Sequence, residues 1–348
     1  MQLRDERYLA LLLATDRKYA LPRAEEARRE AEEIRNLRLA LENKEYAFRL
    51  GPLRKLAPWI REMRKGQHRL KMQLQLNVRD RRDLLEGWDM ERFRLYHRYL
   101  DVESGLSWLG GCFWNRGRSF VLYGADEGNW HTYHRGLGYV YWALRVHSGI
   151  REMAPWHSFW QVEVASDVAH ALTFRRWAFA TFFRDILLRS LVDQAQSSKP
   201  WWVCSPFTAF MIRLCQLWSG TAAGQARPTM ESLGGYASVI DAWTRGGAEL
   251  AKAINLACDF HCVRLRPRLH GEGDFDYDLV GGDPCEILAI YRIREQLGLD
   301  TPKIRRPLLD SPLANPPMHI PRIEDPLLDE VARKFCAEFS QEEGPWKS

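Results

Sequence analysis

The chain has 348 residues, of which 46% are hydrophobic and 12% aromatic, and this content can fill a sizeable core and excludes a disordered chain. No uncharged apolar run reaches the roughly eighteen residues that a membrane span needs, and the N-terminal pattern is not that of a signal peptide. Seven scattered cysteines without framework spacing favour free thiols. We therefore expect a cytoplasmic protein that makes no membrane contact.

The net charge of +5 is unevenly distributed. Residues 1–100 carry 24 Lys or Arg against 16 Asp or Glu, which leaves 26 against 29 for residues 101–348. This asymmetry predicts a basic N-terminal helical region, 1–115, and an aromatic-rich helical core with a proline-rich tail, 116–348. The two regions can also form one continuous domain.

Helical periodicity recurs along the first half of the chain. A helix after Pro22 is predicted to carry a thin apolar seam at three- and four-residue steps, formed by Ala24, Ala27, Ala31, Ile34 and Leu41. Further helices are expected at about 67–85 and 90–114. The segment RGRSFVLYGADEGNW, residues 116–130, favours a short strand or hairpin.

Helices are also expected over residues 127–147, 156–194, 204–218 and 236–262. Before the next helix, Asp283 is an N-cap candidate, Pro284 fits the first helical position and Glu286 fits the acid of a capping box. That helix should end near Gly298. Seven prolines in residues 300–326 predict an extended surface segment, and a last helix should cover 326–340.

The predicted fold class is therefore mainly α. We expect a multi-helix, bundle-like array with at most a short hairpin and a proline-rich extended C-terminal segment.

One stretch, HGEGDFDYDLVGGDPCEIL at residues 270–288, has six carboxylates although the chain is basic overall. Asp274, Asp276 and Asp278 resemble the start of a calcium loop. The pattern then fails, because the sixth position is Leu279 instead of glycine and the twelfth is Cys285 instead of glutamate. An EF-hand is therefore disfavoured.

Two interpretations of this acidic segment remain open. In an extended chain the three aspartates point one way and the two aromatic side chains the other. The segment is then either a solvated acidic loop or a docking surface for a basic partner with aromatic anchors. The candidate partner-binding residues are Glu272, Asp274, Phe275, Asp276, Tyr277 and Asp278.

Other patterns carry less specific chemistry. Two helix faces could offer metal ligands, Glu127, His131 and His134 on one and Glu163, Asp167 and His170 on the other, but their spacing departs from a di-iron bundle. Cys258, His261 and Cys262 lack the second ligand pair of a structural zinc site. We found no serine elbow and no phosphate-binding glycine loop.

These observations predict no catalytic residues, no metal and no cofactor. Basic runs at residues 64–71 and 79–82 would suit nucleic acid, but acidic residues interleave with the basic ones almost everywhere. We therefore expect no nucleic-acid partner.

Two parts of the chain resemble a known group of proteins. RDERYL, residues 4–9, opens a charged helical region, and PCEILAIYRIREQLGLD followed by RRPLLDSPL lies near the C-terminus. These segments resemble all-helical bacterial toxin-immunity proteins of type VI secretion and related polymorphic toxin systems, including the PoNe-immunity group.

The resemblance implies a non-enzymatic, cytoplasmic immunity protein that binds and neutralises a cognate secreted toxin during bacterial competition. Many such toxins are nucleases with a cationic cleft, which an acidic segment could fill. Two alternatives stay open. One is a helical metal-dependent enzyme that uses the two faces described above, and the other is an adaptor or chaperone that a secreted effector needs for delivery.

Overall fold

A computed structural model describes residues 23–42, 90–123, 127–153, 161–194, 205–220, 228–264 and 283–340. Over these ranges the secondary structure consists of helices, without a strand, which confirms the mainly-α prediction. The elements are α2 (Arg23–Glu42), α4 (Met90–Tyr123), α5 (Glu127–Met153), α6 (Gln161–Thr173), α7 (Trp177–Gln194), α8 (Pro206–Ser219), η4 (Glu231–Tyr236), α9 (Ala237–Asp241), α10 (Gly247–Arg264), α11 (Cys285–Gln296), η5 (Pro312–Ala314) and α12 (Pro326–Phe339).

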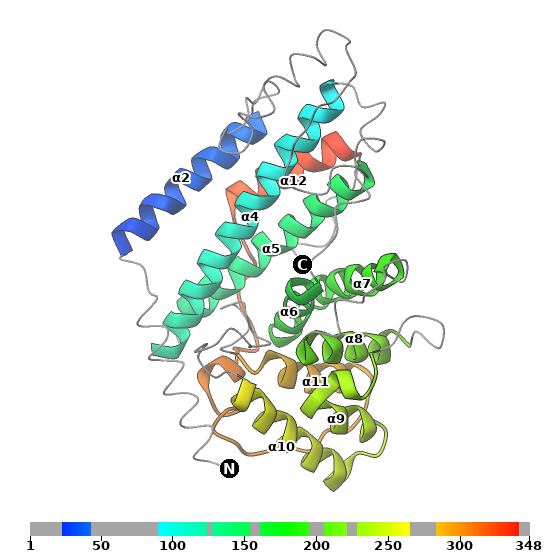
Figure 1. The fold of residues 1–348 in the computed structure, drawn as a ribbon. Helices are drawn as coiled ribbons and strands as arrows, with labels where there is room; N and C mark the ends of the chain where they lie inside the picture. The colour runs from blue at the N-terminus through cyan, green and yellow to red at the C-terminus, as the bar shows by residue number, and fades with distance from the viewer. Residues whose placement is uncertain are drawn as a thin grey trace.

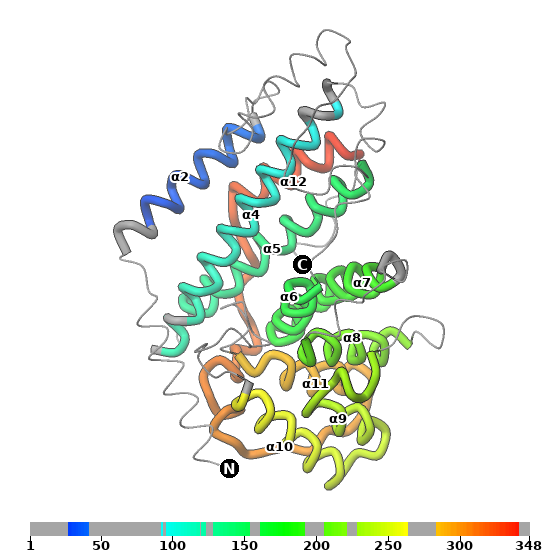
Figure 2. The backbone as a smooth tube through the Cα atoms, viewed as in Figure 1, coloured from blue at the N-terminus to red at the C-terminus, as the bar shows by residue number. Residues whose placement is uncertain are grey.

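The helices form two groups (Figure 1). The long helices α4 and α5 pack along each other, and α2 and α12 pack against them. The shorter helices α6 to α11 form a second, compact group, and the chain after α11 returns from this group to α12 beside the long helices (Figure 2). None of the helices described is both long and apolar enough to cross a membrane.

Glycines bring α4 and α5 into close contact. A Cβ atom added at Gly117 would lie 2.3 Å from the backbone N and Cα atoms of Tyr133. One added at Gly136 would lie 2.9 Å from the carbonyl oxygen of Gly110. Because these distances are shorter than any normal carbon contact, the two helices can approach this closely only with glycine at the crossing.

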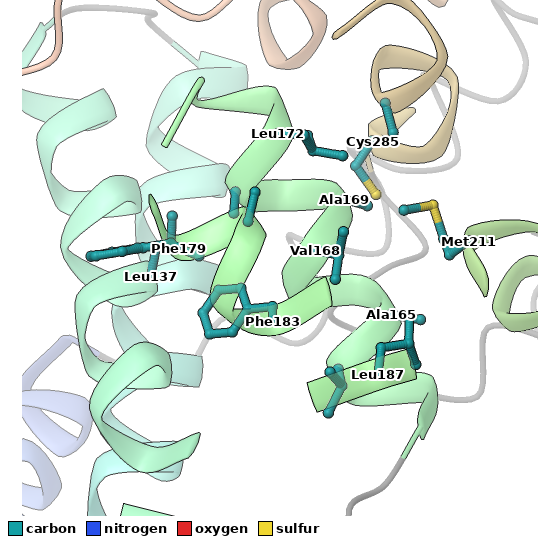
Figure 3. Packing of buried hydrophobic residues seen from close by; sticks show 14 of the residues in the cluster. Leu137, Ala165, Val168, Ala169, Leu172, Phe179, Phe183, Leu187, Met211 and Cys285 are labelled. Atoms are coloured by element: carbon teal, nitrogen blue, oxygen red, sulfur yellow. The ribbon is translucent and has the colours of Figure 1, made fainter. Parts of the chain in front are cut away.

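Helix α6 lies at the centre of the compact group and is buried on nearly all sides. Figure 3 shows Leu137 of α5 and Phe179 of α7 on one side of Val168, and Met211 of α8 and Cys285 of α11 on the other. A helix that is apolar around most of its circumference belongs in a core. α6 therefore connects the long helices to the rest of the compact group.

The helix predicted after Pro22 is present as α2, but its buried side differs from the predicted seam. Ala27 and Ala31 are exposed. The buried apolar residues are Leu37, Ala40 and Leu41, in the C-terminal half, which packs against α4 and α12. Lys334 of α12 also donates a hydrogen bond of 2.7 Å to the Leu41 carbonyl oxygen. The seam prediction was right at Leu41 and at Ile34, which packs against the core, and wrong at Ala27 and Ala31, because larger side chains provide most of the apolar contact area.

The strand or hairpin predicted at residues 116–130 was wrong where the structure describes it. Residues 116–123 are the last turns of α4, and residues 127–130 begin α5. Val121 is buried and Gly117 contacts α5, so tertiary packing overrides the weak strand preference of this segment. The boundary expected between residues 115 and 116 lies inside α4.

The remaining helices agree with those predicted from the periodicity, except that two predicted helices are each divided into two. The predicted helix 156–194 is divided between α6 and α7, and the predicted helix 236–262 is divided by positive φ angles at Gly246 and Gly247. The proline-rich segment has no α-helix before α12, but it contains a turn at residues 307–309 and η5, and it also contributes to the core. Leu308, Leu313 and Ile323 are buried. The helix expected at 67–85 lies outside the described residues.

Asp325 fixes the start of α12 and joins it to α5. Its Oδ1 atom accepts hydrogen bonds from the backbone N–H groups of Leu327 at 2.9 Å and Leu328 at 3.4 Å. Its Oδ2 atom accepts from Arg135 Nε and Tyr139 OH, each at 2.8 Å. One buried carboxylate therefore caps one helix and binds a second.

The α4–α5 crossing can be tested with two glycines of the same helix. Gly117→Ala should lower the free energy of unfolding by about 1–3 kcal/mol, because the new methyl group must push α5 away. Gly111→Ala is the matched control. Its Cβ atom meets nothing within 4 Å, so helix propensity should raise stability by up to about 1 kcal/mol. Urea unfolding measures both, and equal stability of the two variants would contradict the packing described.

Candidate functional site at the base of the acidic segment

The structure describes the two helix ends that flank the acidic segment. The predicted partner-binding residues, Glu272, Asp274, Phe275, Asp276, Tyr277 and Asp278, lie outside the described residues. On one side of them α10 ends at Arg264, and on the other Asp283 and Pro284 precede α11. His261 lies three residues before Arg264, and Glu286 lies three residues after Asp283. The side chains of these two residues contact each other.

The buried carboxylate of Glu286 joins these two helix ends. Its Oε1 atom lies 2.5 Å from Nδ1 of His261, which is in the last turn of α10. The same oxygen accepts a hydrogen bond of 3.0 Å from the hydroxyl of Tyr236 at the end of η4. All three residues are fully buried. We call Tyr236, His261 and Glu286 the base cluster.

The base cluster holds its two helix ends together strongly. A buried carboxylate without partners would be very unfavourable, and removing one member of a buried charged pair typically costs about 3–5 kcal/mol. Burial and the neighbouring Glu286 carboxylate both raise the pKa of Tyr236 well above its ordinary value, so its hydroxyl keeps the proton that it donates. The last turn of α10 and the first turn of α11 are therefore held together.

Asp283, at the same end of the segment, contacts α6. Its Oδ2 atom lies 3.3 Å from Nε2 of His170, and both side chains are buried. Nδ1 of His170 donates to the carbonyl oxygen of Ser166 at 2.8 Å, which fixes the ring orientation. Burial lowers the pKa of His170 to about 3. The edge of Trp114 also packs against this ring.

The capping box predicted at Asp283 and Glu286 is not the main role of these acids. Pro284 is the N-cap of α11 and provides no side-chain cap. Asp283 contacts His170, and Glu286 contacts His261. Local spacing alone could not show this, because the partners lie far away in the sequence.

Cys285 stands between these two acids and is not suited to act as a nucleophile. Burial, with further contributions from Glu286 and Asp283, raises the pKa of its thiol well above the ordinary value. The thiol therefore stays protonated. Cys258 is also buried, and Cys262 is partly buried. In the part of the chain that is described, no three His, Cys, Asp or Glu residues are arranged to hold a metal ion.

The two helix faces considered for a metal carry histidines that are already engaged. Nε2 of His134 accepts a hydrogen bond of 2.6 Å from Arg176 Nε, so its lone pair points at a cation. Burial, followed by Arg176 and His131, lowers the pKa of His134 well below its usual value. His170 faces Asp283, as described above.

Comparisons with known proteins identify no relative. No family model matches the sequence, and no similarity to a curated protein or to a solved structure was detected.

Asp167 on α6 should make stability depend on pH. Burial, followed by repulsion from Glu163, raises the pKa of this carboxyl well above its ordinary value of 3.8. The folded state then keeps a proton that the unfolded chain releases, so the free energy of unfolding falls as the pH rises above about 4, by up to about 1.4 kcal/mol per pH unit, until the folded pKa is passed.

Asp167→Asn should remove this slope, because the amide cannot ionise. Urea unfolding of both proteins from pH 4 to 8 measures the difference, which should grow with pH in favour of the variant. A difference that does not change with pH would show that Asp167 is charged in the folded state.

Proposed function

We propose that this chain is a non-enzymatic binding protein of the cytoplasm that neutralises a cognate secreted toxin, as bacterial immunity proteins do. The observation that carries the proposal is the buried contact of 2.5 Å between Glu286 and His261. It joins α10 and α11, the two helices between which residues 272–278 lie in the sequence. The proposal also draws on the sequence resemblance of residues 4–9 and 284–313 to immunity proteins.

A fixed base favours binding for a physical reason. Ordering a loop on association costs conformational entropy, and part of this loss is avoided when the ends of the loop are already held in place. Here Glu286 holds the first turn of α11 to the last turn of α10, and Asp283 contacts α6. The described residues that flank the segment therefore form a rigid support.

The composition of the segment indicates the surface that it would meet. Four acidic residues and two aromatic residues lie within residues 272–278. Clustered carboxylates attract a basic surface over long distances, and aromatic side chains supply contact area once the proteins meet. A nuclease toxin has such a surface, because its cleft binds phosphates. The segment would then occupy the place of the nucleic acid.

The proposal can be tested by expressing the protein encoded beside this one, with and without this chain, in the same cells. Protection from a toxic neighbour supports immunity and provides the partner for binding measurements. A toxin that stays active, but requires this chain for its delivery, would identify an adaptor and contradict the proposal.

Replacing Asp274, Asp276 and Asp278 by serine should mainly slow association with the toxin. We expect the association rate constant to fall by about tenfold or more at low salt, and by less at high salt, because ions screen the attraction. Stopped-flow fluorescence measures this rate.

A control variant changes three exposed acids elsewhere, Asp300, Asp310 and Glu324, to the neutral residues Asn, Asn and Gln. It removes the same net charge but leaves the segment intact. If both triple variants slow association equally, overall charge is responsible and the segment is not the interface.

A further inference from the structure

Arg175 ends α6 in a conformation that normally selects glycine. Its φ angle is +55°, in the left-handed region. The N–H of Arg175 bonds to the Leu172 carbonyl at 3.0 Å and that of Arg176 to the Ala171 carbonyl at 2.8 Å. This pair of bonds defines a Schellman motif, whose left-handed position is usually glycine because a side chain there is strained. An arginine at this strained position indicates that its side chain has a functional role.

The guanidinium of Arg175 lies next to a second arginine. Nη2 of Arg175 and Nη1 of Arg292, which is on α11, are each 3.4 Å from the same atom, Oε2 of Glu295. One carboxylate oxygen therefore serves two cations, and the group of three has a formal charge of +1. Burial and repulsion from Arg175 both lower the pKa of Arg292.

The Glu295 carboxylate does not complete the hydrogen bonding of Arg175 and Arg292. Contacts of 3.4 Å are longer than the 2.7–2.9 Å typical of charge-assisted hydrogen bonds. Nε of Arg292 is buried and has no hydrogen-bond partner. The Glu295 side chain is 51% exposed, so it can rotate into water at little cost, and Arg175 is itself 33% exposed. The two arginines can therefore accept another anion.

We propose that Arg175 and Arg292 form a binding site for a phosphate group, either inorganic phosphate or a small phosphate monoester, which takes the place of the Glu295 carboxylate. A dianion matches two guanidinium charges, whereas Glu295 supplies one negative charge. Guanidinium groups bind phosphate oxygens in pairs, which a single carboxylate oxygen does not allow. This site is on α6 and α11 and does not depend on the proposed immunity function.

The first measurement is the thermal stability of the full chain against phosphate concentration. A ligand that binds only the folded state stabilises it by RT ln(1 + [L]/Kd), so the melting temperature rises with the logarithm of ligand concentration once that concentration exceeds Kd. Inorganic phosphate should raise the melting temperature in this way, and chloride at matched ionic strength should not. Glycerol 3-phosphate distinguishes the two sources, because stronger stabilisation by this ester identifies a monoester site, and equal or weaker stabilisation identifies a site for the free ion. If neither compound raises the melting temperature beyond the effect of chloride, the proposal is overturned.

Variants separate this site from general effects of charge. Arg175→Gly should raise the melting temperature without phosphate, because it relieves the left-handed strain, and should weaken phosphate binding by about tenfold or more. Glu295→Gln should strengthen phosphate binding, because it removes the competing carboxylate. These opposite effects on stability and binding would not arise from a purely structural role.

Arg245→Ala is the control, since Arg245 is also exposed and also contacts two carboxylates, those of Asp241 and Glu249. Phosphate should bind this variant as tightly as the wild type. Wild-type phosphate affinity in Arg175→Gly, or an equal loss in Arg245→Ala, would overturn the proposal.

Discussion

A fully buried carboxylate, that of Glu286, constrains how the compact group of helices is assembled. A charge in the protein interior loses its hydration and must be compensated by hydrogen bonds. The imidazole of His261 and the hydroxyl of Tyr236 supply them, from α10 and η4. Because Glu286 itself begins α11, these three elements can pack only in the arrangement that brings their polar groups together. Apolar contacts around the base cluster would tolerate small shifts, but these hydrogen bonds would not.

The same constraint connects the fold to the proposed function. Residues 272–278 lie between α10 and α11 in the sequence, and the buried pair of His261 and Glu286 joins these two helices. Asp283 adds a second contact, with His170 on the central helix α6. Through α6 the support extends to the long helices α4 and α5.

Most of the helices could be predicted from the sequence, and the contacts between them could not. Apolar periodicity correctly indicated α4, α5, α8 and α12, because helices with one or more buried faces impose that pattern. It failed at residues 116–123, where aromatic and β-branched residues suggested a strand but glycine-mediated packing against α5 keeps the chain helical. Arg175 also gave no signal of a helix end, because glycine is the residue that marks one.

The site illustrates the same limit. Glu286 stands where a capping acid belongs, and a local pattern seemed to explain it completely. Its true partners are 25 and 50 residues away, and only the fold brings them together. Local spacing also drew attention to His261, but in a group with two cysteines that suggested zinc. The pairing of two residues that each had a local explanation could not have been inferred without the arrangement of α10 and α11.

A double-mutant cycle on the free energy of unfolding tests the central claim most directly. It compares the wild type with His261→Ala, Glu286→Ala and the double variant. If the buried pair holds the two helix ends together, each single replacement will be strongly destabilising and the double replacement will be little worse, with a coupling energy of about 2 kcal/mol or more. Effects that add to within about 0.5 kcal/mol would show that His261 and Glu286 act independently, and would contradict the account of a fixed base for the acidic segment.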